Sequence, residues 1–380
     1  MAREAVCYFE SLRDAAIGEQ LADWSAAAPG AAVLAFVAEA DRGDIPQLQQ
    51  QCRAAGVQLL GGMFPELLHG DGFRRRGVLL FRLNEAPVYS LVEGLSAGVP
   101  GRNAAIERMA EVAVSMDPAR GKGTLLLLFD AMVPTIESWL ETLYQRIGRR
   151  VYYLGFNAGS ETFEPMPCLF DNERLVQDAV LVAALPGLGG GVLAHGYSAP
   201  EHLFTATSTQ GNRIESIDWR PALEVYAELA RREYGVEITR ENFYEHAVHF
   251  PFGLVRATGE VVVRIPVALD DSNALFCIGE VPENAILCLL RANDADPEDA
   301  VGELVRNLPR DGTGQVLACY CAGRRMHDPV RAAAELRQLA ARLPVPLAGA
   351  LTLGEIGSST REGYPLFHNA TLVVADWSGA

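Results

Sequence analysis

The sequence predicts an α/β protein made of repeated strand–helix–strand units with mixed sheets. Stretches 31–62, 124–161 and 315–355 share one pattern: an apolar strand, a helix that begins at a proline, a second strand that reaches a glycine, and a polar turn. Because an ordinary domain does not repeat itself in this way, the pattern indicates a duplicated fold.

Each unit predicts its elements in the same order. The expected helices are Pro46–Gly56, Pro134–Gly148 and Pro329–Leu343. Proline suits the first helical position, where its missing N–H removes no hydrogen bond, and each helix is apolar on one face. A strand–helix–strand crossover is right-handed and makes its two strands parallel. After each polar turn we expect an apolar strand to return antiparallel, over residues 77–83, 175–185 and 371–377.

The stretch from about residue 187 to residue 310 does not follow this pattern. It opens with the glycine-rich segment Gly187–Gly191 and continues with short strand-like runs around one helix, Pro221–Tyr234. The change of pattern divides the chain into two pseudo-related regions, residues 30–186 and 187–376. We expect their sheet edges to face a shared crevice.

Composition excludes several classes of protein. The formal net charge of −16 argues against nucleic acid and anionic membranes as partners, because phosphate groups repel such a surface. No apolar run reaches the roughly 18 residues that a membrane span needs, and no basic-then-apolar leader opens the sequence. The seven cysteines lack the spacing of a disulfide framework. We therefore expect reduced thiols in the cytoplasm.

The repeat gathers polar side chains at one edge of each sheet. The ends of both parallel strands, the helix N-terminus and the start of the returning strand meet there, and ligands of open α/β sheets bind at this edge. A glycine–glutamate turn also has a purely structural explanation, since a positive-φ glycine with a capping carboxylate makes a stable turn. The candidate ligand-binding residues are Arg324, Glu355, His368, Asn369, Gly354, Cys321, Glu161, Asp171 and His195.

Motifs near the C-terminus resemble the FIST family, which is named for F-box and intracellular signal transduction proteins. The matching segments are Pro346-Leu347-Ala348-Gly349, Gly354-Glu355-Ile356 and Phe367-His368-Asn369-Ala370-Thr371. Further family-like segments precede them in the expected order: residues 191–199, Gly211-Asn212, Arg220-Pro221-Ala222-Leu223 and Gly279-Glu280-Val281-Pro282. The similarity runs from about residue 30 to residue 376.

The resemblance implies a FIST N-type region over 30–186 and a FIST C-type region over 187–376. It also implies an intracellular bacterial sensor of a small molecule, with amino acids as proposed ligands. Some family members resemble haem-binding nitric-oxide sensors that act on a histidine kinase. The first turn, Gly61–Glu66, is shorter than the family pattern and lacks its small hydroxyl residues, so the resemblance carries no ligand contact to that turn.

Metal and haem are the alternatives to a metal-free small-ligand site. His246 and His249 would share a helix face, but two histidines at that spacing without a third ligand are a weak zinc motif. Haem needs one axial histidine and an apolar pocket, and His195 and His368 are the candidates for that role. A hydrogen-bonded structural histidine is the competing explanation for each.

Catalytic motifs find little support, so we do not expect an enzyme. Cys319 and Cys321 alternate along one strand and face opposite sides, which is not a redox arrangement. The sequence has neither a nucleophile elbow nor a phosphate-binding loop. His368 and Glu355 could exchange protons, but only their shared sheet edge relates them.

Taken together, these observations predict a sensory protein without a cofactor. Arg324 is expected to bind an anionic ligand end, Glu355 an amine or another donor, and His368 to orient the turn or contact the ligand. The signal is expected to pass to a separate protein such as a histidine kinase. A non-catalytic interaction scaffold without a ligand is the remaining alternative.

Overall fold

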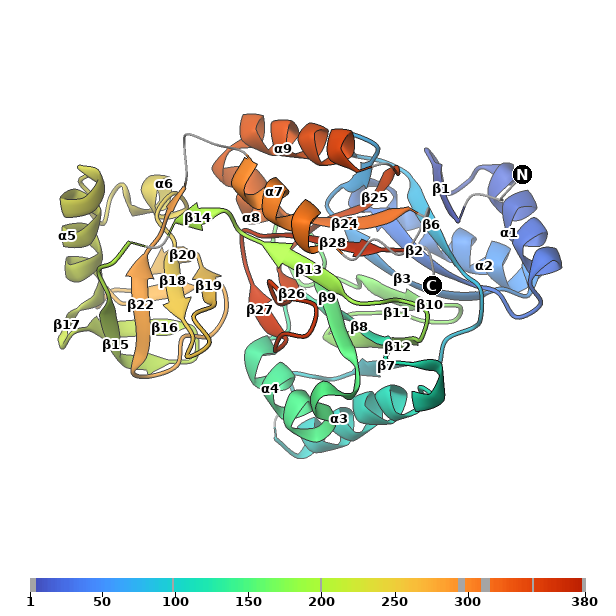
Figure 1. The fold of residues 1–380 in the computed structure, drawn as a ribbon, viewed down its shortest axis with the longest axis horizontal. Helices are drawn as coiled ribbons and strands as arrows, with labels where there is room; N and C mark the ends of the chain where they lie inside the picture. Colours follow the sequence, from blue (N-terminus) through green and yellow to red (C-terminus); the bar gives the residue numbers. More distant parts are fainter. Residues whose placement is uncertain are drawn as a thin grey trace.

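The computed structural model describes residues 5–97, 99–198, 200–292, 298–308, 315–343 and 345–377. Within these ranges the chain forms three related units and a separate inserted domain (Figure 1). The prediction of an α/β protein with mixed sheets is confirmed. No helix in these ranges is long and apolar enough to cross a membrane.

The first unit lies at the N-terminal end of the chain, blue in Figure 1. Its parallel strands β2 and β3 flank α2, and β6 returns antiparallel beside β2, with β1 at the edge. Its elements are β1 Val6–Phe9, α1 Ala15–Ala27, β2 Ala32–Ala38, α2 Ile45–Ala55, β3 Gln58–Phe64 and β6 Val78–Leu83.

The second unit repeats this arrangement with β8 and β9 parallel, β12 returning beside β8, and β7 at the edge. Its elements are β7 Tyr89–Glu93, α3 Val99–Val114, β8 Thr124–Asp130, α4 Ile136–Ile147, β9 Tyr152–Ala158 and β12 Ala179–Leu185. The prediction that α4 begins at Pro134 is wrong by two residues. Thr135 has a left-handed backbone (φ 58°), so the helix starts only after it.

The third unit has the same strand arrangement, with β24 and β25 parallel, β28 returning beside β24, and β13 at the edge. An additional short helix, α8, precedes the crossover helix α9. The elements of the third unit are β13 Gly191–Ala194, α7 Glu298–Asn307, β24 Val316–Cys321, α8 Ala322–His327, α9 Pro329–Arg342, β25 Leu347–Thr352 and β28 Leu372–Asp376.

The units are joined by exchanged hairpins. The hairpin that follows the second strand of each unit pairs with a sheet of another unit: β4–β5 with β25, β10–β11 with β3, and β26–β27 with β9. The exchange is cyclic, so each sheet gives one hairpin and receives one. The hairpin strands are β4 Leu67–His69, β5 Gly72–Arg74, β10 Leu169–Asp171, β11 Leu175–Val176, β26 Glu355–Gly357 and β27 Leu366–His368.

One glycine in the second strand of each unit lies where the first strand and the incoming hairpin flank it. Gly61, Gly155 and Gly349 each lie opposite a residue of the first strand and a residue of the incoming hairpin. A Cβ at these positions would lie 2.4, 2.4 and 1.7 Å from a carbonyl oxygen of the first strand, far inside contact distance. The repeated glycine therefore reflects close approach of backbones.

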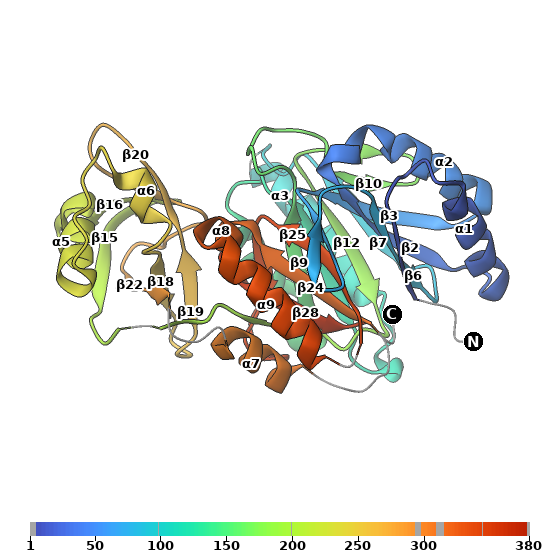
Figure 2. The same cartoon turned by 90° about the horizontal axis from the view of Figure 1, so that it is seen from above.

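The inserted domain, residues 200–292, lies between β13 and α7 of the third unit and projects to the left in Figures 1 and 2. It has an eight-stranded antiparallel sheet and a hydrophobic core of its own around Tyr226 and Phe252. The short strands β14 Tyr197–Ser198 and β23 Arg291–Ala292 pair where the chain enters and leaves it.

The elements of this domain are β15 Phe204–Gln210, β16 Arg213–Ile217, β17 Arg220–Pro221, α5 Ala222–Tyr234, α6 Phe243–Ala247, β18 Phe252–Val255, β19 Val261–Arg264, β20 Pro266–Leu269, β21 Leu275–Cys277 and β22 Ala285–Leu289. Helix α5 matches the helix expected over Pro221–Tyr234. The domain thus accounts for most of the stretch that departs from the repeat.

Candidate functional site

Glu355 begins β26 and is completely buried. The hydroxyl groups of Thr352 and Thr371 donate to its two carboxylate oxygens at 2.5 and 2.6 Å. Burial raises the pKa of Glu355 to about 7, although these hydrogen bonds act to lower it. The carboxyl group is therefore poised to change its protonation near neutral pH, inside the protein.

His368 and Asn369 follow on the strand opposite Glu355. His368 pairs with Glu355 in the β26–β27 register and is fully buried. Neither ring nitrogen of His368, nor the Oδ1 of Asn369, has a hydrogen-bond partner within the described ranges. Burial lowers the pKa of His368 well below its ordinary value, so the ring is neutral.

Cys321 also lies in this buried region. Its sulfur accepts a hydrogen bond from the backbone N–H of Ala370 at 3.1 Å. Burial raises the pKa of the thiol far above its usual range, and the nearby Glu355 adds to this effect. Cys321 is accordingly a protonated, unreactive thiol. Position 354 requires glycine. Its backbone φ of +140° is strained for other residues, and the ring of Phe367 occupies the place where a Cβ would lie.

Arg324 is committed to a buried ion pair. Its guanidinium donates to both carboxylate oxygens of Glu335 at 2.6 and 2.9 Å. It also donates to the backbone oxygens of His195 and Ala370. The side chains of Arg324 and Glu335 are 6% and 0% exposed. This environment does not support the predicted contact between Arg324 and an anionic ligand.

The two predicted carboxylates of the second unit lie in separate structural contacts. Burial tends to raise the pKa of Asp171, but hydrogen bonds from the backbone N–H of Glu173 and from Arg174 bring it below its ordinary value. Glu161 accepts from Arg325 at 3.0 Å, and Arg325 also pairs with Glu66 at 2.8 Å. The shortened first turn therefore contributes Glu66 to an ion-pair cluster.

Haem does not fit the candidate histidines. The Nδ1 of His195 accepts from the backbone N–H of Tyr197 at 3.0 Å, and burial, followed by Arg324, lowers the pKa of His195 to about 4. The cavity beside it measures about 10 Å³, room for about one water molecule. His368 is enclosed on all sides. Neither ring faces a space that a porphyrin could enter.

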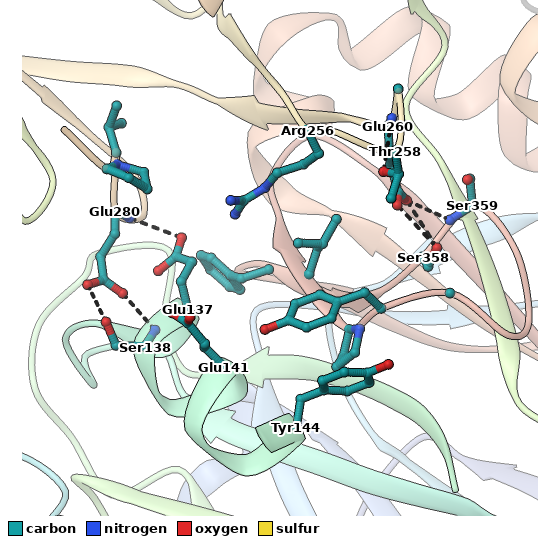
Figure 3. Close-up of a pocket in the computed structure, with 18 of the residues that line it drawn as sticks. Glu137, Ser138, Glu141, Tyr144, Arg256, Thr258, Glu260, Glu280, Ser358 and Ser359 are labelled. Atoms are coloured by element: carbon teal, nitrogen blue, oxygen red, sulfur yellow. Dashed lines mark hydrogen bonds between the residues drawn. The ribbon is translucent and has the colours of Figure 1, made fainter. Parts of the chain in front are cut away.

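A large crevice lies elsewhere, between the inserted domain and the second and third units (Figure 3). Its volume is about 1270 Å³. One wall is α4 of the second unit. The opposite wall is the β18–β19 turn and the loop before β22, and residues 358–367 of the exchanged hairpin form the floor. We call this space the interdomain crevice.

Polar contacts across the crevice hold its walls together. Glu280 of the inserted domain accepts from the backbone N–H and the hydroxyl of Ser138, at 2.9 and 2.7 Å, and so caps the start of α4. Glu260 accepts from the hydroxyl of Ser358 and from the N–H of Ser359. Figure 3 shows these contacts on opposite sides of the crevice. They fix the inserted domain to both neighbouring units.

Two groups of opposite charge face the crevice with unused hydrogen-bonding atoms. The Nε of Arg256 and the Oε2 of Glu137 are buried, and neither has a partner within the described ranges. Burial, and then Arg264, lower the pKa of Arg256. Burial raises the pKa of Glu137 to about 7 against the opposing effect of Arg264. The other oxygen of Glu137, Oε1, pairs with Arg264 and accepts from the backbone N–H of Glu280 at 3.0 Å, so each of the two groups has one polar atom left unsatisfied.

Aromatic rings from α4 and from the exchanged hairpin also line the crevice. The rings of Tyr144 and Tyr364 lie 4.4 Å apart between their centroids. Glu141 lies one helical turn from Glu137 on the same wall. The crevice lining includes two arginines and six glutamates, and the part around Arg256, Glu137 and Glu141 offers a cation, two carboxylates and a nearby apolar surface to one small molecule.

The sequence did not identify these residues as a site. Glu280 lies within the segment Gly279-Glu280-Val281-Pro282, which the family resemblance had singled out. Arg256 and Glu137 are not part of a recognisable sequence motif. They are 119 residues apart (256 − 137) and line the same space only because the inserted domain docks on the second unit. The nine predicted residues lie mainly in buried structural contacts, and none of them lines the crevice.

The fold and the crevice define a class of mixed α/β proteins with an inserted domain docked on repeated units. The FIST N domain matches residues 31–220 and the FIST C domain matches residues 222–358. The chain belongs to the FIST family, whose domains are associated with sensing in signal transduction. No curated protein matches the chain.

Proposed function

We propose that this protein is a cytoplasmic sensor that binds a small amino-acid-like ligand in the interdomain crevice. The observation that carries the proposal is the pair formed by Arg256 and Glu137. Both side chains line one space from opposite walls. Each has one buried polar atom without a partner within the described ranges, the Nε of Arg256 and the Oε2 of Glu137, whose other oxygen pairs with Arg264. A zwitterion supplies both missing partners at once.

The ligand's carboxylate would accept from Arg256, since a guanidinium binds carboxylates through parallel hydrogen bonds. Its ammonium group would donate to Glu137, with Glu141 adding negative charge on the same wall. The ammonium would also hold Glu137 in its ionised form, because a neighbouring positive charge lowers the pKa of a carboxyl group. An apolar ligand side chain would lie against Tyr144 and Tyr364.

The signal would pass through the position of the inserted domain. The ligand would contact Arg256 on the inserted domain and Glu137 on the second unit, so it would favour the docked state over an undocked one. A separate protein, such as a histidine kinase, would read this difference. The proposal includes no cofactor and no catalytic step.

The cysteines support the proposal that the protein is located in the cytoplasm. The buried free thiols of the described residues include Cys52, Cys168, Cys277, Cys288, Cys319 and Cys321. Burial raises the pKa of most of these thiols, which keeps them protonated. Unpaired cysteines in this number are typical of a reducing compartment.

A thermal-shift screen tests the ligand class. We expect some zwitterionic amino acids at millimolar concentration to raise the melting temperature by mass action. Matched amines without a carboxylate and acids without an amine should have little effect. Arg256→Gln should abolish the rise, and Arg146→Gln, which alters an exposed arginine on α4, should keep it. A complete absence of shifts would favour the scaffold alternative, in which a partner binds regardless of metabolites.

A further inference from the structure

Two histidines face each other across a second contact between the inserted domain and the third unit. His249 follows α6 of the inserted domain, and His327 is the last residue of α8. Their Nδ1 atoms are 2.8 Å apart, and the ring planes are inclined by 57°. Figures 1 and 2 show α6 on the side of the inserted domain that faces α8. This contact is separate from the crevice, whose lining includes no histidine.

We propose that His249 and His327 together bind a divalent transition-metal ion such as Zn²⁺ or Ni²⁺ through their Nδ1 atoms. Imidazole nitrogen is a preferred ligand of these metals, at a bond length of about 2.0–2.1 Å. Two such bonds place the nitrogens about 2.9 Å apart at the right angle of an octahedral or square-planar site, and about 3.3 Å apart at a tetrahedral angle. The observed separation of 2.8 Å therefore matches two adjacent positions of an ion such as Ni²⁺, and tetrahedral Zn²⁺ would need the two rings to move apart by about 0.5 Å.

The chemical state of the two rings suits this role. Burial lowers the pKa of both histidines, that of His327 to about 4, so both rings are neutral at pH 7, which is the state in which imidazole binds a metal. In the metal-bound form each ring carries its proton on Nε2. The hydrogen bond between the two Nδ1 atoms, which needs one proton, is exchanged for two metal–nitrogen bonds.

The surroundings provide negative charge and access to solvent. The Asp328 carboxylate is close enough to act on the pKa of both histidines, and His246 acts on that of His249. Arg324 and Arg331 oppose a cation from the side of the third unit. Within the described ranges no three His, Cys, Asp or Glu side chains are placed to hold one ion. Water therefore completes the coordination, and the metal exchanges readily.

A metal at this position would join two parts of the fold. His249 and His327 are 78 residues apart in sequence, and they lie on the inserted domain and on the third unit respectively. A bound ion would favour the docked position of the inserted domain, because an undocked domain would lose one of the two ligands. The site would thus act on the same movement as the proposed ligand but through other residues.

Calorimetric titration of the tag-free full-length protein with Zn²⁺ and with Ni²⁺ tests the proposal. We expect saturable binding of one ion per chain, and an affinity at least tenfold lower in both His249→Asn and His327→Asn, since even outer-shell changes cost 10–100-fold. His202→Asn, at an exposed histidine, should bind like the parent. Absence of saturable binding, or equal affinity in all variants, would overturn the proposal.

A second measurement uses the unaltered protein, in case a variant does not fold. In an NMR spectrum of protein with labelled histidines, substoichiometric Zn²⁺ should shift the signals of His249 and His327 first, leaving His202 unchanged. Shifts confined to exposed histidines would mean surface binding and would refute the proposal. Neither outcome depends on an amino-acid ligand, so this site and the crevice are tested separately.

Discussion

Replacing Glu335 by glutamine should destabilise the third unit strongly. The Glu335 carboxylate accepts from Arg324 at 2.6 and 2.9 Å and from the hydroxyl of Tyr320 at 2.6 Å. Arg331 makes a further ion pair with it at 3.1 Å. Since Glu335 is 0% exposed, Glu335→Gln leaves the buried charge of Arg324 without a counter-charge.

The size of the effect follows from the cost of an unpaired buried charge. Breaking a buried ion pair by removing one partner costs about 3–5 kcal/mol. For a cooperative unit of 150–250 residues, each kcal/mol lowers the melting temperature by about 2–4 °C, so the expected fall is roughly 6 °C or more. Thermal unfolding followed by circular dichroism measures this fall directly.

Two further variants isolate the charge effect. Arg324→Met combined with Glu335→Leu removes both charges and should recover much of the lost stability, because an apolar pair carries no desolvation penalty. Asp44→Asn breaks the exposed pair between Arg13 and Asp44 and should change the melting temperature little. If Glu335→Gln melted like the parent, Arg324 would not be neutralised by this carboxylate, and its role as a ligand contact would have to be reconsidered.

Three other predictions concern the fold and the crevice. Gly349→Ala should abolish soluble expression, because the added Cβ would lie 1.7 Å from a backbone oxygen of β24, whereas Gly18→Ala, with open space around it, should express normally. The pKa of Glu355 is about 7, above its ordinary 4.5, so its contribution to stability is complete below pH 4.5 and is lost as the pH rises through 7. Urea unfolding between pH 5 and pH 8 should show a loss of stability to which Glu355 contributes up to about 3 kcal/mol. The loss should therefore be smaller in Glu355→Gln, where the contribution of Glu137 remains, and identical pH profiles would contradict this reasoning. Glu280→Gln should weaken the cap on Ser138 and speed hydrogen exchange at the start of α4, which an unchanged exchange rate would disprove.

The repeat could be read from the sequence because its cause is local. Strand, crossover helix and returning strand each leave an apolar or proline pattern within some 50 residues. The glycine alignment was also visible, since Gly155 and Gly349 stand at the same distance before a glutamate. The structure supplies the reason, which is the close approach of strand backbones at Gly61, Gly155 and Gly349.

The exchange of hairpins and the docking of the inserted domain could not be predicted in this way. Both depend on which surfaces meet after the units have formed, and pairing between distant segments leaves no periodic pattern. Arg324 therefore looked accessible at a sheet edge, although Glu335 on α9 neutralises it. Arg256 carried no motif, yet the fold places it opposite Glu137 in the crevice.

Isothermal titration of amino acids into the parent protein and into Arg256→Gln tests the central claim most directly. The account predicts saturable binding of at least one zwitterionic amino acid to the parent and its loss in Arg256→Gln, with Arg146→Gln binding as the parent does. Glu137→Gln should weaken the binding of the same ligand, because it removes the charged acceptor for the ammonium group. Binding that survived both Arg256→Gln and Glu137→Gln would place the ligand elsewhere and contradict the account.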